Sequence, residues 1–265
     1  MSQPTAWICV TCGTQFPPAA TTPDSCPVCE DERQYVGLDG QLWTTLEALN
    51  RDHSNTFTEL EHGVVAIQTQ PKFGIGQRAI LIQTPQGNIL WDCISLLDES
   101  TKQRVEELGG VQAMAISHPH YYASMIEWSH AFGNAPIYLH QSDHPWVMRS
   151  DETIQFWSGE TYALLGGFQL IRIGGHFDGY QILHQPGVVF VGDLPQVCMD
   201  RKWVSFMYSY PNLIPLAKKD VNYIAGQMGR LDYDRLYGAF PHQNITQDAK
   251  AMVARSAMRY IEQIS

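Results

Sequence analysis

Histidines and a carboxylate at the ends of apolar runs are the residues of this chain best suited to chemistry. His118 and His120 follow the run VQAMAIS one residue apart, His176 follows FQLIRIGG, Asp193 ends GVVFVGD, and His242 lies in AFPHQN. Side chains at i and i+2 of an extended or turning backbone can reach one ion, and imidazole and carboxylate ligands suit zinc or non-haem iron. Loops at strand ends present such ligands on a rigid scaffold. The pattern therefore indicates a metal site.

Four of the six cysteines form two C-x-x-C pairs near the start of the chain, Cys9 with Cys12 and Cys26 with Cys29. Each pair can form a tight knuckle whose thiolates face one ion, and two knuckles close a tetrahedral sulfur site. A segment this short has little core of its own, so the metal would supply most of its stability. We therefore expect a metal-binding module over residues 1–37.

The sequence around these cysteines, WICVTCGTQFPP with CPVCE, resembles rubredoxin-like and rubrerythrin-type iron knuckles and also zinc ribbons. Gly13 matches the glycine that commonly follows the second cysteine of an iron knuckle, whereas Glu30 stands at that place in the second pair. Tetrahedral sulfur suits either metal. We expect structural zinc in this module, with iron as the alternative.

The composition narrows the class of protein. The chain has 265 residues, of which 44% are hydrophobic and 17% are charged, as in a folded globular protein. Its formal net charge of −10 disfavours nucleic-acid partners and anionic membrane surfaces, because both bind basic faces. The start, MSQPTAWICV, lacks the segments of a secretory signal, and no apolar run is long enough for a membrane-spanning helix. We expect a cytoplasmic protein whose cysteines are thiols or metal ligands.

The elements that would position the candidate ligands alternate along the chain from about residue 38. Apolar runs predict strands over residues 63–70, 78–84, 88–94, 111–117, 135–140, 168–175, 180–185 and 187–193. Amphipathic runs with capping residues predict helices over residues 40–50, 98–110, 124–133, 219–231 and 246–264. Strands that alternate with helices, with meanders between them, are typical of a layered α/β domain.

The order of these motifs resembles that of the metallo-β-lactamase superfamily. HPHYYA stands where this family has H-x-H-x-D-H, and GGHFDG, VFVGD and FPHQN follow in the family's order. The resemblance covers about residues 40–265. It implies an αββα sandwich over residues 38–265, with the metal ions at one edge of its two sheets.

The resemblance also implies a role for each candidate residue. His118, His120 and His176 match the histidines of the family's first metal site. Asp193 matches its bridging carboxylate, and His242 matches a ligand of its second site. Each of the five would then be a metal ligand.

Two positions depart from the family motif. Tyr122 stands in place of its aspartate, and Ala123 stands in place of its second-site histidine. The second site would keep Asp193 and His242, with the Tyr122 phenol as a third ligand at best. We therefore expect one zinc or iron ion at the histidines, and Tyr122 as a ligand, a proton donor or a wall of the pocket. Asp92, which ends NILWD, would orient one of the metal ligands without binding the metal itself.

Three histidines and an open coordination position are typical of a catalytic ion. The leading hypothesis is a metal-dependent hydrolase that acts on a small-molecule ester, thioester, lactone or phosphoester. Asp193 would orient or deprotonate the water, while His242 or Tyr122 would stabilise the oxyanion or protonate the leaving group.

Two other classes of protein fit the same residues. A degenerate active site beside a zinc ribbon suits a non-catalytic metal-binding or interaction protein. A rubredoxin-like module joined to such a domain resembles the flavodiiron proteins, which implies a redox function.

Overall fold

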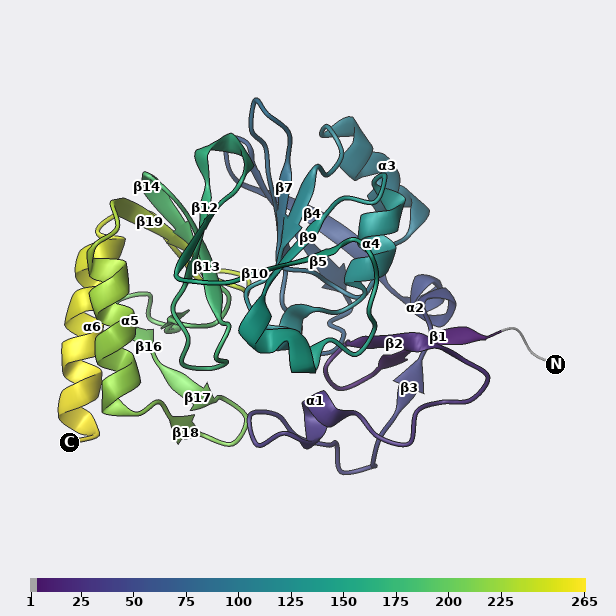
Figure 1. Ribbon diagram of the computed structural model, residues 1–265, viewed down its shortest axis with the longest axis horizontal. Helices are drawn as coiled ribbons and strands as arrows, with labels where there is room; N and C mark the ends of the chain where they lie inside the picture. Colours follow the sequence, from purple (N-terminus) through teal and green to yellow (C-terminus); the bar gives the residue numbers. More distant parts are fainter. Residues whose placement is uncertain (1–3) are drawn as a thin grey trace.

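The computed structural model describes residues 4–265 and consists of two facing sheets with helices on both outer faces (Figure 1). The first sheet has seven strands in the spatial order β10-β9-β8-β7-β6-β5-β4. Strands β4 to β7 pair antiparallel, and β7 to β10 pair parallel. The strands are β4 (Ser54–Glu61), β5 (Val64–Gln70), β6 (Ala79–Ile82), β7 (Ile89–Trp91), β8 (Ala113–Ala115), β9 (Ile137–His140) and β10 (Ile154–Trp157).

The second sheet has six strands in the order β11-β12-β13-β14-β19-β20. All of its pairs are antiparallel except β14 with β19. The strands are β11 (Thr161–Ala163), β12 (Gln169–Arg172), β13 (Gln181–Gln185), β14 (Gly187–Phe190), β19 (Tyr233–Tyr237) and β20 (Asn244–Ile245). Two short hairpins lie between β14 and β19: β15 (Gln196–Val197) with β16 (Val204–Ser205), and β17 (Met207–Ser209) with β18 (Ile214–Pro215).

Helices cover the outer faces of both sheets. The α-helices are α2 (Leu46–Asp52), α3 (Glu99–Glu107), α4 (Met125–Ala131), α5 (Lys218–Gly229) and α6 (Ala249–Gln263), and the 3-10 helices are η1 (Pro119–Tyr121), η2 (Gln141–Trp146) and η3 (Leu165–Gly167). Figure 1 shows α5 and α6 side by side on the second sheet, and α3 and α4 on the side of the first.

Three hydrophobic clusters separate these layers. In β6, Leu81 packs outward with the helical residues Val105 and Trp128, whereas Ile80 packs inward against the second sheet. Phe190 of β14 belongs to the same inner cluster. This alternation follows from the period of two along a strand, and both faces are apolar because both are covered. A third cluster joins the outer face of the second sheet to α5 and α6. The predicted αββα sandwich is confirmed.

The N-terminal module contains a three-stranded sheet in the order β2-β1-β3 and a short helix. Its elements are β1 (Thr5–Cys9), β2 (Gln15–Ala19), α1 (Pro27–Glu30) and β3 (Trp43–Thr44). Strand β3 comes after residue 37, so the sheet of the module extends past the predicted boundary. The division into residues 1–37 and 38–265 stays a prediction.

Local capping explains where the structure and the expected helices differ. The helix expected over residues 40–50 begins only at Leu46, because the Thr45 side chain accepts a hydrogen bond from Ala48 N at 3.1 Å and caps it there. Asp98 caps α3 as expected, accepting from Thr101 N at 2.7 Å. Ser124 precedes α4 but donates to Ile94 O and Ser95 O, in the loop between β7 and α3, instead of capping the helix.

None of the helices between residues 4 and 265 combines the length and the apolar character needed to cross a membrane.

Candidate metal centres

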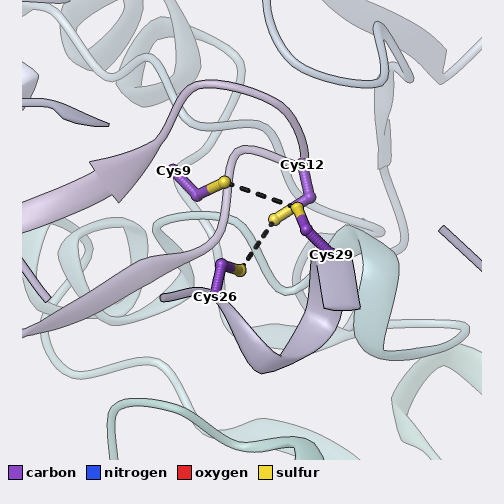
Figure 2. Close-up of side chains that lie close together, drawn as sticks. All are labelled: Cys9, Cys12, Cys26 and Cys29. Carbon is purple, nitrogen blue, oxygen red and sulfur yellow. Dashed lines mark hydrogen bonds between the residues drawn. The ribbon is translucent and has the colours of Figure 1, made fainter. Parts of the chain in front are cut away.

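The four cysteine sulfurs of the N-terminal module converge on one point (Figure 2). Cys9 Sγ lies 3.5 Å from Cys29 Sγ, and Cys12 Sγ lies 3.7 Å from Cys26 Sγ. All four sulfurs lie within 4.8 Å of one another, and all four residues are buried. A tetrahedron with metal–sulfur bonds of about 2.3 Å has edges of about 3.8 Å, so the sulfurs are spaced as ligands of one ion.

The backbone turns both cysteine pairs toward this point. In the first knuckle, Gly13 N donates to Cys9 O at 2.8 Å, and Gly13 has a φ of +83°, which a glycine adopts without strain. A Cβ on Gly13 would lie 2.6 Å from the Ser95 hydroxyl, which donates to Gly13 O. In the second knuckle, Cys26 precedes α1 and accepts from Cys29 N at 2.9 Å.

The cysteine cluster is suited to a bound cation. Hydrogen bonds with Cys26, Cys29 and Cys9, together with burial, raise the pKa of the Cys12 thiol well above its ordinary value. Thiolates packed this closely without water repel one another, and a divalent ion removes that cost. The cluster therefore fits a tetrahedral metal, and its sulfur ligands suit zinc and iron equally.

The three predicted histidine ligands also come together. His118 follows β8, His120 lies in η1, and His176 follows β12, so the ends of two strands from facing sheets meet here. One nitrogen from each imidazole lies within 4.8 Å of the others, and all three residues are buried. His120 Nδ1 lies 3.1 Å from His176 Nε2.

Neighbouring groups occupy one nitrogen of the His176 ring and one of the His118 ring. The Tyr208 backbone oxygen can only accept, so His176 Nδ1 donates to it at 2.6 Å and leaves its Nε2 as a lone-pair donor. Ser117 Oγ hydrogen-bonds His118 Nδ1 at 2.9 Å, and His118 Nε2 is buried without a hydrogen-bond partner in the described chain. Burial lowers the pKa of His118 and of His120 well below the ordinary value. Neutral rings with free, converging nitrogens fit a metal ion.

Asp193 lies beside the histidines at the end of β14. Its Oδ1 is 3.6 Å from His118 Nε2. The Tyr121 hydroxyl donates to Asp193 Oδ2 at 2.9 Å, and the Tyr180 hydroxyl donates to Oδ1 at 3.3 Å. Burial and the nearby carboxylate raise the pKa of Tyr121 and of Tyr180 well above the ordinary value, so both remain donors. Two phenols therefore hold one carboxylate at the edge of the cluster.

Asp92 supports His118 through Ser117, as the sequence suggested. Asp92 Oδ1 accepts from Ser117 N at 2.7 Å, and the Ser117 hydroxyl contacts the His118 ring. Burial raises the pKa of Asp92 to about 7. Gly192 explains how β8 and β14 approach each other here, because a Cβ at this position would lie 2.5 Å from Tyr180 Oη and would also meet Ser117 Oγ.

Tyr122, Ala123 and His242 do not join the histidines. Tyr122 is buried and lines a small cavity with Ala123 and with Thr14 and Gln15 of the module. Ala123 O accepts from Gln15 N at 3.0 Å. Tyr122 and Ala123 thus contact the N-terminal module. His242 is exposed, with a φ of +64°, in the turn between β19 and β20.

A cavity of about 120 Å³ opens over the histidine cluster. His120, His176 and Asp193 line it from the sandwich, and Arg33 and Gln34 line it from the module. The histidine site is therefore built by both parts of the chain.

Several residues around the site carried no sequence signal. Tyr121 is adjacent to Tyr122, and only its side-chain direction, set by η1, separates their roles. In the sequence, Tyr180 looks like one more residue of an apolar strand. Arg33 lies 143 positions from His176, whose backbone oxygen it contacts. No local pattern could have paired them.

Comparisons with known proteins agree with this fold. No protein-family model matches the chain. The uncharacterized protein YmaE of Bacillus subtilis (strain 168) is 47% identical over 267 residues, which cover 98% of this chain and 97% of YmaE.

Solved metallo-β-lactamase structures superimpose on most of the chain. VMB-1 at pH 5.5 has a TM-score of 0.60 at 13% identity and covers 80% of this chain and 99% of its own. The DIM-1 metallo-β-lactamase has a TM-score of 0.59 at 11% identity and covers 80% of this chain and 99% of its own. FIM-1 from Pseudomonas aeruginosa in its mono-zinc form has a TM-score of 0.55 at 15% identity and covers 78% of this chain and 96% of its own. At these identities the likeness establishes the fold alone.

Proposed function

We propose that this chain, which belongs to the same family as YmaE of Bacillus subtilis and has the metallo-β-lactamase fold, is a hydrolase that uses a single metal ion at His118, His120 and His176. The observation that carries the proposal is the convergence of three buried, neutral imidazoles beside a carboxylate and a cavity. Three protein ligands with room for a fourth are the arrangement of catalytic rather than structural zinc.

The chain's own residues divide the chemistry between them. A zinc or iron ion at the three nitrogens would supply Lewis acidity toward a substrate oxygen and toward water. Asp193 accepts a proton from the attacking water, since its carboxylate faces the cluster. Tyr121 and Tyr180 hold Asp193 in its orientation through their hydroxyls.

The atoms of the reaction balance without another reactant. The water oxygen forms a bond to the carbonyl carbon, and the bond to the leaving oxygen or sulfur breaks. The proton accepted by Asp193 passes to the leaving group, which restores the carboxylate. His242 and Tyr122, the other expected proton donors, lie outside the cavity lining and have no part in this scheme.

The cavity favours small carbonyl substrates among the ester, thioester, lactone and phosphoester classes. Its volume of about 120 Å³ is below the roughly 300–1,000 Å³ of typical ligand sites. Among the described residues that line it, Arg33 is the one cation, and Asp31 already pairs with it. The metal ion itself would attract a phosphoester anion, so charge does not exclude that class. In-line phosphoester chemistry is commonly assisted by a pair of metal ions, however, and a site for one ion favours an ester, thioester or lactone.

A second candidate is a metal-binding protein without turnover. The observation in its favour is that Tyr122 and Ala123 stand in the place of second-metal ligands and contact the module. Both candidates bind metal at the histidines, and hydrolysis alone separates them.

The test is a hydrolysis screen on the zinc-loaded and iron-loaded full chain, with small esters, thioesters, lactones and phosphoesters as substrates. We expect turnover of a carbonyl substrate that His176→Ala abolishes and that Asp193→Asn lowers about 100-fold or more. Turnover that survives His176→Ala unchanged would refute the proposal. Metal binding with no hydrolysis of any class would favour the second candidate.

A further inference from the structure

We infer that Arg33 is a positioning residue for His176, through which the N-terminal module raises the metal affinity of the histidine site. The inference rests on the proposed function only in requiring that the histidines bind a metal. Neither the fold nor the likeness to YmaE assigns this residue a role.

Arg33 is locked between the module and the histidine site. Its Nε and Nη2 donate to the two carboxylate oxygens of Asp31, at 2.5 Å and 2.9 Å, and its Nη1 donates to His176 O at 3.1 Å. The Arg33 and Asp31 side chains are only 11% and 18% exposed. The two-point pairing with Asp31 fixes the plane of the guanidinium, so its contact with the His176 backbone is also fixed.

Arg33 also packs on the rings around His176. Its Cζ lies 3.8 Å from the ring centre of Phe177, which follows His176, and 5.5 Å from that of Tyr208. Tyr208 supplies the backbone oxygen that accepts from His176 Nδ1. A cation over aromatic faces is stabilising when it is shielded from water. One guanidinium therefore touches the backbone of His176, the next residue, and the residue that orients the ring.

The neighbours of Arg33 bind the same loop. Asn212 Nδ2 donates to the backbone oxygens of Glu32 and Gln34, both at 2.8 Å. Tyr208 Oη donates to Glu32 Oε1 at 2.8 Å, and Ser209 Oγ donates to Arg33 O at 3.2 Å. Residues 32–34 and 208–212 thus form one hydrogen-bonded unit.

The same loop contacts the backbone of Asp193. Tyr210 Oη donates to Asp193 O at 2.7 Å. The unit of residues 32–34 and 208–212 therefore contacts the backbone oxygens of both His176 and Asp193. A shift in the module would reach both residues through these contacts.

The cysteine site adjoins this unit on the side of the module. Residues 31–34 follow directly after α1, which begins next to the ligand Cys26 and contains the ligand Cys29. A helix of four residues is not stable in isolation, and the buried core of the module consists mainly of the cysteines themselves with Phe16 and Val28.

The test measures zinc affinity in the full chain, by competition with a chromophoric chelator, for wild type, Arg33→Met, Arg33→Lys and Arg51→Met. His118→Ala identifies which of the zinc-binding steps belongs to the histidines. Arg51→Met is the matched control, because Arg51 forms an exposed ion pair with Glu47 on α2, away from the site.

We expect Arg33→Met to weaken the zinc affinity of the histidine site about 10- to 100-fold, which is the range for residues that orient a metal ligand. The zinc affinity of the cysteine site should not change. Lysine cannot pair at two points, so Arg33→Lys should fall between Arg33→Met and wild type. Equal histidine-site affinity in Arg33→Met and wild type would overturn the inference alone. A wild-type chain that binds zinc only at its cysteines would overturn the proposed function and the inference with it.

Discussion

Tyr121 and Tyr122 are adjacent residues with different surroundings. The Tyr121 hydroxyl donates to Asp193, whereas Tyr122 lines the contact with the N-terminal module. The sequence motif predicts a role at the site for Tyr122, whereas the structure turns Tyr121 toward the site, because η1 sets the direction of each side chain. His118, His120 and His176 were predictable as a group, since each follows an apolar run in the order of the family motif.

Replacing Tyr121 by Phe removes one of the two hydroxyls that hold Asp193. A hydrogen bond to a charged group contributes about 1.5–3 kcal/mol, so kcat should fall about 10- to 100-fold with little change in KM. Steady-state kinetics on the substrate found in the screen measure this. Tyr122→Phe is the control and should retain wild-type kcat; equal kcat in both variants would show that Tyr121 does not orient the carboxylate.

Asp143, in η2, gives the stability a dependence on pH. It accepts from Gly179 N at 2.7 Å, and burial raises its pKa to about 7 from an ordinary 3.8. Because the pKa of Asp143 is higher in the folded state, the protonated carboxyl group favours folding. Its contribution to the free energy of unfolding is complete below pH 4 and is lost as the pH rises through about 7.

Asp143→Asn keeps an accepting oxygen and removes the titration. The free energy of unfolding of the variant relative to wild type should therefore rise between pH 5 and 8, by at most about 1.4 kcal/mol per pH unit. Denaturant titrations across this range measure the difference. A difference that does not vary with pH would mean that Asp143 keeps its ordinary pKa in the fold.

Strand ends bring the ligands together at the scale of the elements. His118 follows β8 in the first sheet, whereas His176 and Asp193 follow β12 and β14 in the second. The strands that carry them are buried on both faces, so their continuous apolar runs were readable in the sequence. Strand β4 was not predicted, because it is an edge strand with an exposed face and few apolar residues, SNTFTELE.

Gly192→Ala tests the close approach of these strand ends. The added Cβ would meet Tyr180 Oη and Ser117 Oγ, which support Asp193 and His118. We expect a loss of about 1–3 kcal/mol in the free energy of unfolding, together with weaker zinc binding at the histidines.

The control for Gly192→Ala is Gly226→Ala in α5, where an added Cβ meets nothing within 4 Å. That variant should be as stable as wild type, or more stable by up to about 1 kcal/mol, because alanine favours helix. Chemical denaturation measures the stability of both variants. A Gly192→Ala variant that is no less stable than Gly226→Ala would contradict the expectation.

The whole molecule combines two metal centres in one structure. The cysteine module supplies Arg33 and Gln34 to the cavity over the histidines and contacts Tyr122 and Ala123. Motif order was enough to predict the sandwich, because it fixes which strand ends meet. The docking of the module could not be predicted, because contacts such as Arg33 with His176 join distant parts of the chain without a local pattern.

The metal content of the purified chain tests the central claim most directly. Elemental analysis after dialysis should find about two metal ions per wild-type chain and about one in His176→Ala, since the four cysteines supply the ligands of one ion and the three histidines supply those of another. One ion per chain in both proteins would contradict the account, because the histidines would then hold no metal.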